Sequence, residues 1–154
     1  MLNNSTQYFF NFDALLFGGV MLFIVLAHHA AYMFLIAHQY EKITDALIAA
    51  KRYGWVRALF YVMAFILALS HLLEIYIWGL ALNLFGLIPN VHQAMLFAGS
   101  VYTTLGFDVN PLPLNWDLVM IMMALSGIIS FGWSISVLFG MTQIIHTARI
   151  QRKA

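Results

Sequence analysis

Residues 100–116 read SVYTTLGFDVNPLPLNW, and the rest of the chain is arranged around this stretch. It lies between two long apolar segments and places Thr104, Gly106 and the aromatic Phe107 close together. A cation that enters a bilayer must replace its hydration shell, and rings of backbone carbonyls can do this. Glycine reaches the left-handed backbone angles that turn successive carbonyls toward one side at little steric cost. The stretch therefore predicts an irregular loop that presents closely spaced carbonyl groups.

The composition indicates a membrane protein. Of the 154 residues, 63% are hydrophobic and only 8% are charged, and the mean hydropathy is +0.87. A soluble globular chain is roughly half apolar and about a quarter charged. The chain contains no cysteine, which excludes a disulfide framework and thiolate metal sites.

Apolar runs on both sides of the loop predict an all-α integral membrane protein. A run of about 20 apolar residues spans a hydrocarbon core of about 30 Å, and three runs have this length. A short apolar helix followed by irregular backbone is typical of a re-entrant loop, which is tolerated at membrane depth only where it lines a cavity or is buried in protein. The expected elements are three membrane helices over Ala14–Leu35, Ala58–Leu84 and Trp116–Ile145, with a re-entrant helix over Val91–Tyr102 between the second and third.

The segment from His38 to Arg57 differs in kind from these runs, because apolar and charged positions fall on different helical faces. We expect it to lie along the membrane surface as an amphipathic helix. The alternative is a simple helical hairpin in solvent. With this segment the chain divides into an N-terminal part, residues 1–57, and a second part, residues 58–154.

The basic residues predict the orientation. All seven Lys and Arg residues lie either between the first two apolar runs or after the last one. Basic segments near membrane helices stay in the cytoplasm. We therefore expect a multi-pass protein of the cell membrane with the N-terminus outside, the C-terminus cytoplasmic and the loop on the outer face.

Residues 58–145 resemble the helix, pore loop and helix unit of the potassium-channel superfamily. The resemblance rests on TTLGF at residues 103–107, on HLLEIYIW before the loop and on FGWS on the last helix, and it is greatest to small bacterial channel-like members. It implies that Val91–Tyr102 is a pore helix and that residues 103–108 form a selectivity filter, composed of Thr103, Thr104, Leu105, Gly106, Phe107 and Asp108. A plain extracellular turn is the alternative interpretation of these residues.

The sequence departs from the family where a second glycine should follow the aromatic residue, since Asp108 comes directly after Phe107. Either Asp108 replaces that glycine, or one residue is deleted and the filter has lost a layer of carbonyls. Val109 follows as it often does after the family's Gly-Asp pair, which favours deletion. We predict weakened potassium selectivity, or a pore that does not conduct at rest.

One loop cannot surround an ion, so a pore implies a homotetramer in the bilayer. We expect a monovalent cation, K⁺ above all, in the filter, no other cofactor and no nucleic-acid partner. Paired acids, an activated nucleophile and a phosphate-binding loop are all missing from the sequence, so we expect no enzymatic activity. The alternatives are a nonconducting pore-loop relative with a structural or sensing role, and a small haem-binding or metal-binding membrane subunit.

Three serines, Ser126, Ser130 and Ser134, share one stripe of the last predicted helix. They are candidates for lining an aqueous cavity, and close helix packing is an equally good interpretation. Gly127 and Gly132 are candidate gating hinges.

Ionisable residues occur at two places within the apolar runs. His71 and Glu74 lie on one face of the second helix, and we interpret them as a hydrogen-bonded pair, with a pH-responsive pair as the alternative. His28 and His29 lie on the first helix and could ligate haem or a metal together with His71. Counted from the inner ends of their helices, however, His28 and His71 differ in expected depth by about 9 Å.

Overall fold

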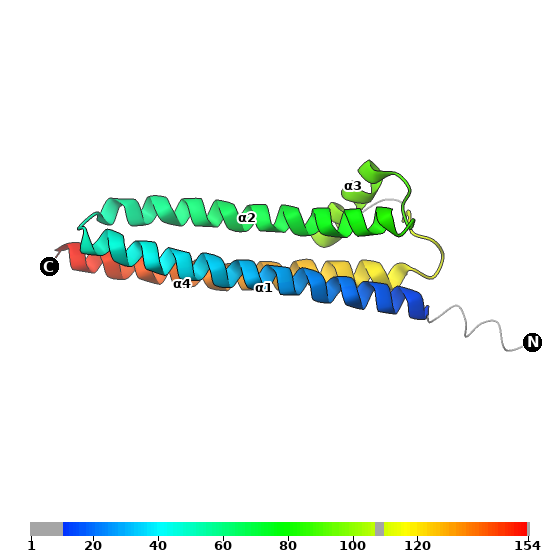
Figure 1. Ribbon diagram of the computed structural model, residues 1–154, viewed down its shortest axis with the longest axis horizontal. Helices are drawn as coiled ribbons and strands as arrows, with labels where there is room; N and C mark the ends of the chain where they lie inside the picture. The colour runs from blue at the N-terminus through cyan, green and yellow to red at the C-terminus, as the bar shows by residue number, and fades with distance from the viewer. Residues whose placement is uncertain (1–10, 107–109, 154) are drawn as a thin grey trace, which may run out of the picture.

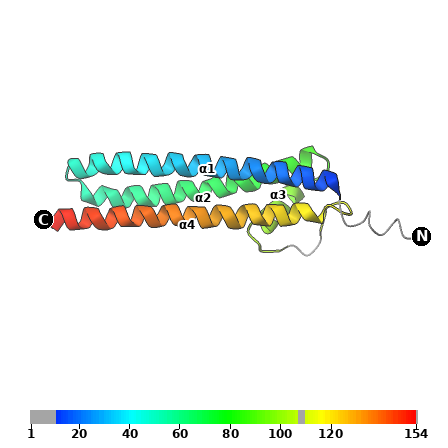
Figure 2. The same ribbon diagram turned by 90° about the horizontal axis from the view of Figure 1, so that it is seen from below.

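The computed structural model describes residues 11–106 and 110–153, and every regular element in this part of the chain is a helix. The helices are α1 (Phe12–Ala49), α2 (Tyr53–Leu84), α3 (Val91–Tyr102) and α4 (Asp117–Lys153). The three long helices run side by side, and the short α3 lies at the end of the bundle where α1 begins and α2 ends (Figures 1 and 2). α1, α2 and α4 are each long and apolar enough to cross a membrane, as predicted.

Asparagine side chains cap the N-terminal ends of α1 and α3. Asn11 Oδ1 accepts hydrogen bonds from the backbone N–H groups of Asp13 and Ala14 at the start of α1. Asn90 caps α3 in the same way, by accepting from the N–H of Gln93 at 2.9 Å. These caps satisfy N–H groups that have no partner inside a helix. They explain why α3 begins at Val91, where the sequence places it.

The segment predicted as a separate surface helix does not form one. α1 continues without a break to Ala49, and α2 begins at Tyr53. The prediction of a helix over residues 38–57 is therefore wrong, and the helical hairpin describes this region better. The physical reason is that residues 36–49 contain neither glycine nor proline, so nothing stops α1 where its apolar run ends.

α3 packs against α2 and runs in the opposite direction along it. Gly79 on α2 lies against Met95, and Gly99 on α3 lies near Ile75. The last residue of α3, Tyr102, contacts Glu74. Since Glu74 precedes the end of α2 by ten positions, α3 ends about 15 Å inside the bundle, measured along α2.

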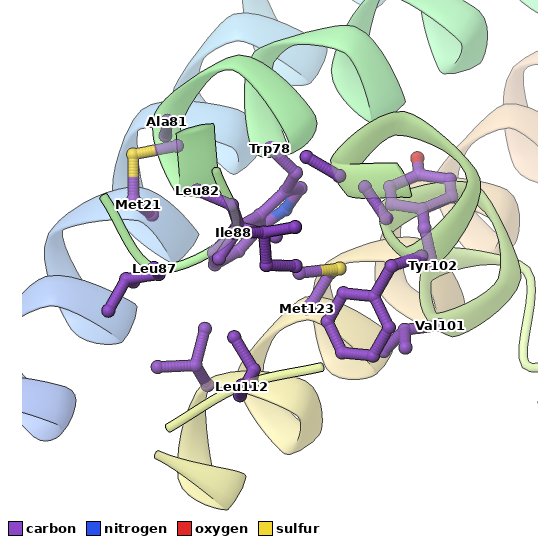
Figure 3. Close-up of a cluster of buried hydrophobic side chains, with 14 of the residues drawn as sticks. Met21, Trp78, Ala81, Leu82, Leu87, Ile88, Val101, Tyr102, Leu112 and Met123 are labelled. Carbon is purple, nitrogen blue, oxygen red and sulfur yellow. The ribbon is translucent and has the colours of Figure 1, made fainter. Parts of the chain in front are cut away.

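Buried apolar side chains form two separate clusters along the bundle. The larger cluster joins all four helices and the connections beside α3 (Figure 3), and Trp78, Leu82, Ile88, Tyr102 and Met123 are among its members. The second cluster lies toward the opposite end, where Tyr40, Leu67 and Met141 meet. Between the two clusters the bundle interior is polar, and the candidate site lies there.

Trp78 connects the larger cluster to α4. Its side chain is fully buried, and its indole N–H donates to Ser126 Oγ at 3.0 Å. We expect Trp78→Phe to lower the free energy of unfolding by about 1–2 kcal/mol, because the variant loses buried area and one hydrogen bond. Denaturation in mixed micelles measures this. Trp55 is 65% exposed, so Trp55→Phe is the control, with an expected change below about 0.5 kcal/mol; equal values for both variants would contradict the prediction.

Candidate functional site

Five polar side chains from all four helices meet in the interior between the two apolar clusters. His29 comes from α1, His71 and Glu74 from α2, Tyr102 from α3 and Ser134 from α4. The side chains of His29, Glu74 and Tyr102 are fully buried, and those of His71 and Ser134 are nearly so. We call these five residues the polar ring.

The five side chains form a closed circle of hydrogen-bond contacts. His29 Nδ1 lies 2.6 Å from Glu74 Oε1, and the Tyr102 hydroxyl donates to Glu74 Oε2 at 2.5 Å. His71 Nδ1 lies 2.9 Å from the Tyr102 oxygen, and His71 Nε2 lies 3.0 Å from Ser134 Oγ. Ser134 Oγ also lies 3.3 Å from His29 Nε2, which closes the circle. Each member therefore contacts two others. Every imidazole nitrogen of His29 and His71 and both carboxylate oxygens of Glu74 have a partner.

The predicted bond between His71 and Glu74 is replaced by bonds to other helices. Glu74 pairs with His29 and Tyr102, whereas His71 pairs with Tyr102 and Ser134. The depth offset expected between His28 and His71 does not separate His29 from His71, because the imidazole centroids of His29 and His71 are 5.1 Å apart. His29 precedes the turn residue Lys51 by 22 positions and His71 follows it by 20, so a hairpin without a surface helix brings them level.

The donor atoms of His29, His71 and Glu74 lie within 4.8 Å of one another, so these residues form a candidate metal-binding group. Two donors on a tetrahedral zinc ion lie about 3.3 Å apart. The 2.6 Å between His29 Nδ1 and Glu74 Oε1 is instead the length of a direct hydrogen bond. The geometry therefore favours protons over an ion between these groups.

A haem between the two histidines does not fit this geometry either. Ser134 Oγ alone bridges the Nε2 atoms of His29 and His71, at 3.3 and 3.0 Å, which leaves no space for a porphyrin between the rings. His28, the third residue of the predicted ligand set, lies outside the polar ring. Its imidazole packs against Tyr32, and its buried Nε2 has no hydrogen-bond partner.

The serine stripe of α4 faces the interior of the bundle instead of an open cavity. Ser126, Ser130 and Ser134 are all buried. Ser126 accepts from Trp78, and Ser134 belongs to the polar ring. Ser130 approaches Glu74 and Tyr102, but its hydroxyl has no hydrogen-bond partner. Close packing is thus the interpretation that agrees with their placement.

The two glycines proposed as hinges have different surroundings. A Cβ atom added at Gly127 would lie 2.0 Å from the carbonyl oxygen of Tyr102, so this position lets α4 approach the end of α3 closely. A Cβ added at Gly132 would meet no atom within 4 Å. Close packing therefore accounts for the glycine at position 127. The surroundings of Gly132 do not require a glycine there.

The predicted filter residues Thr103 to Gly106 follow α3 and begin the connection to α4, while Phe107 and Asp108 lie outside the described residues. Leu105 N–H donates to the carbonyl of Ser100, and Thr104 N–H donates to that of Val101. This pair of bonds is a Schellman motif, which requires a left-handed residue, here Thr104 with φ 58°. A β-branched residue with this φ is strained by about 1–2 kcal/mol. Strained backbone of this kind is concentrated at functional sites.

All five residues of the polar ring occur in the sequence predictions, but none of their five contacts was predicted. His29 was noticed separately as a possible ligand and Tyr102 as the end of the short helix. The signal that could have found them is the similar distance of His29 and His71 from the turn at Lys51, 22 positions before it and 20 after it. Comparisons with protein-family models, with curated proteins and with solved structures found no match.

Proposed function

We propose that the chain assembles as a tetramer whose central axis is a pore for monovalent cations, with residues 103–108 as its filter. One observation carries this proposal. Non-helical, solvent-exposed backbone begins after Tyr102, which lies deep in the bundle.

The depth follows from the helices beside this residue. Tyr102 contacts Glu74 on α2 and lies against Gly127 on α4. Each of these positions is ten residues from the nearer helix end, Leu84 or Asp117. At 1.5 Å per residue the end of α3 therefore lies about 15 Å inside the bundle. If Leu84 and Asp117 mark the edge of the hydrocarbon core, this depth is near the middle of a core of about 30 Å.

The backbone N–H groups of residues 103–106 all donate to carbonyls of α3, so it is the carbonyl groups of these residues that need partners which lipid cannot supply. Residues 103–106 are all exposed on the single chain, and Leu105 is 82% exposed. Irregular backbone at membrane depth is tolerated only where protein covers it or water reaches it. A ring of four chains around a water-filled axis provides both. The C-terminal end of α3, which carries the negative end of the helix dipole, favours a cation there.

The rest of the chain is compatible with this arrangement. The turn between α1 and α2 lies at the end of the bundle opposite α3 (Figure 1), and Lys42, Lys51, Arg52 and Arg57 all lie in or within about two helical turns of it. If this end is cytoplasmic, as the distribution of basic residues indicates, the loop opens outward. Since the serine stripe is buried, other positions of α4 would line an inner cavity, and Ile128 and Ile135 are exposed there. We expect weak selectivity for potassium over sodium because the second glycine is missing.

Two glycines with similar backbone strain provide the test. Gly106 has φ 90° and Gly86 has φ 72°, and a Cβ at either position would meet no atom within 4 Å. Alanine costs about 1–2 kcal/mol at either position, but only Gly106 lies in the proposed filter. We expect Gly106→Ala to reduce potassium flux into proteoliposomes about tenfold, whereas Gly86→Ala retains the wild-type flux.

Native mass spectrometry on the same samples gives the number of copies. Four copies that pass potassium, and sodium at a comparable rate, would support the proposal. Any other copy number, or equal flux in the two variants, would overturn it. A tetramer that passes no cation would instead support the nonconducting relative.

A further inference from the structure

We infer that the polar ring is a binding site for a single proton, which it holds in addition to the protons of neutral histidine, serine and tyrosine side chains. The inference depends on the five contacts of the ring alone. It holds whether or not the chain conducts cations.

The argument is a count of hydrogens. The ring contains five contacts, and each contact needs one hydrogen between its two heavy atoms. Neutral His29 and His71 supply one hydrogen each, and the hydroxyls of Ser134 and Tyr102 supply one each. An ionised Glu74 supplies none. Four hydrogens cannot complete five contacts, so the closed ring requires a fifth.

The fifth proton has three possible places, which are Glu74, His29 and His71. In each arrangement Tyr102 donates to Glu74, and the Ser134 hydroxyl donates to whichever histidine has an unprotonated Nε2, so all five contacts persist. In each arrangement the ring as a whole is neutral. Neutrality matters because the ring is buried, and an isolated charge at this place would be far more costly than a compensated one.

One proton more or fewer breaks the circle. A sixth proton gives the buried ring a net positive charge, whether it places both imidazoles in the cationic form or one imidazole beside a protonated Glu74, and it leaves one hydrogen without an acceptor. Loss of the fifth leaves a buried carboxylate charge and one contact without a hydrogen. The titratable groups that face one another are His29 from α1, His71 and Glu74 from α2 and Tyr102 from α3. Among the described residues α4 contributes only the hydroxyls of Ser130 and Ser134.

The surroundings fit a site that is built to keep this proton. The unpartnered hydroxyl of Ser130 lies beside Glu74 and Tyr102, where it can donate to the carboxylate when the ring proton leaves. Tyr102 is also the last residue of α3 and directly precedes Thr103. The polar ring that holds the proton therefore connects α1 to the residue that directly precedes the exposed loop.

The substitution Glu74→Gln distinguishes an exchangeable bound proton from a hydrogen that is part of a side chain. The amide of Glu74→Gln accepts through its oxygen and donates through its nitrogen, so it supplies the fifth hydrogen as part of its covalent structure. We expect this variant to keep five contacts with no proton to lose.

The measurement is the stability of the full-length protein in detergent micelles as a function of pH. Near pH 8 the glutamate and histidines of an unfolded chain hold no extra proton, whereas the folded ring holds one. Unfolding should therefore release about one proton per chain, and the folding equilibrium constant should fall about tenfold for each unit rise in pH. The sign is that of a group that binds its proton more tightly in the folded state. Glu74→Gln should show no such fall.

His28→Gln is the matched control, because His28 is adjacent to His29 but outside the ring. It should keep the wild-type pH dependence. The same pH dependence in the wild type and in Glu74→Gln would overturn the inference. If Glu74→Gln fails to fold, calorimetry of the unaltered protein in buffers of different ionisation enthalpy still counts the released proton. A count near zero would also overturn the inference.

Discussion

Replacing Tyr102 with phenylalanine is expected to lower the free energy of unfolding by about 3–5 kcal/mol, because the change breaks two contacts of the polar ring at once. The hydroxyl donates to Glu74 at 2.5 Å and contacts His71 at 2.9 Å. Phenylalanine retains the aromatic side chain and its packing, but it leaves a carboxylate oxygen of Glu74 and an imidazole nitrogen of His71, both buried, without partners. Unpartnered buried groups cost about 1–3 kcal/mol each, and more when charged.

Denaturation of the purified protein in mixed micelles measures this loss. Tyr76→Phe is the control, since Tyr76 lies on the same helix as Glu74 and is 52% exposed. Its expected change is within about 0.5 kcal/mol. If Tyr102→Phe were as stable as the wild type, the ring contacts would contribute nothing to stability. A double-mutant cycle that combines Tyr102→Phe with Glu74→Gln should show a coupling free energy of about 0.5–3 kcal/mol, because the side chains of Tyr102 and Glu74 are in contact.

The second large effect is expected from Gly127→Ala. The new methyl group would lie 2.0 Å from the carbonyl oxygen of Tyr102 and 3.0 Å from its carbonyl carbon. Both are backbone atoms, so the clash is relieved only if the end of α3 moves away from α4. That movement also strains the contact between Tyr102 and Glu74. We expect a loss of about 3 kcal/mol, at the upper end of the range for overpacked cores.

Gly132→Ala is the matched control on the same helix, and it should change stability in the opposite direction. Its Cβ meets no atom within 4 Å, so the variant gains the higher helix propensity of alanine, at most about 1 kcal/mol. Two variants that alter cation flux equally without altering stability would favour the hinge interpretation instead. The thermal unfolding midpoint and the flux assay together distinguish these outcomes.

Local signals in the sequence were sufficient for most of the helices. Long apolar runs located α1, α2 and α4, and a short apolar run located α3 over Val91–Tyr102. The length of α1 was missed, although residues 36–49 contain no residue that ends a helix. The amphipathic pattern of residues 38–57 predicts a separate helix, but this pattern does not end α1. In a hairpin that extends beyond the bilayer, the same pattern marks one face packed against neighbouring helices.

The polar ring could be predicted only in part. Intramembrane ionisable residues must find partners, which correctly singled out His29, His71 and Glu74. Which residues pair is a tertiary question. It depends on the hairpin register that brings His29 level with His71 and on the ten-residue depth of α3, and neither has a local signature in the sequence.

The contact between His29 and Glu74 also bears on how the chain enters the membrane. Both residues belong to the hairpin formed by α1 and α2, which leaves the ribosome before α3 and α4 exist. A hairpin of α1 and α2 that entered the bilayer first would already contain the partner of this acid, and it would not need the second half of the protein to supply one. A chain that began at residue 58 would have to insert the same acid alone.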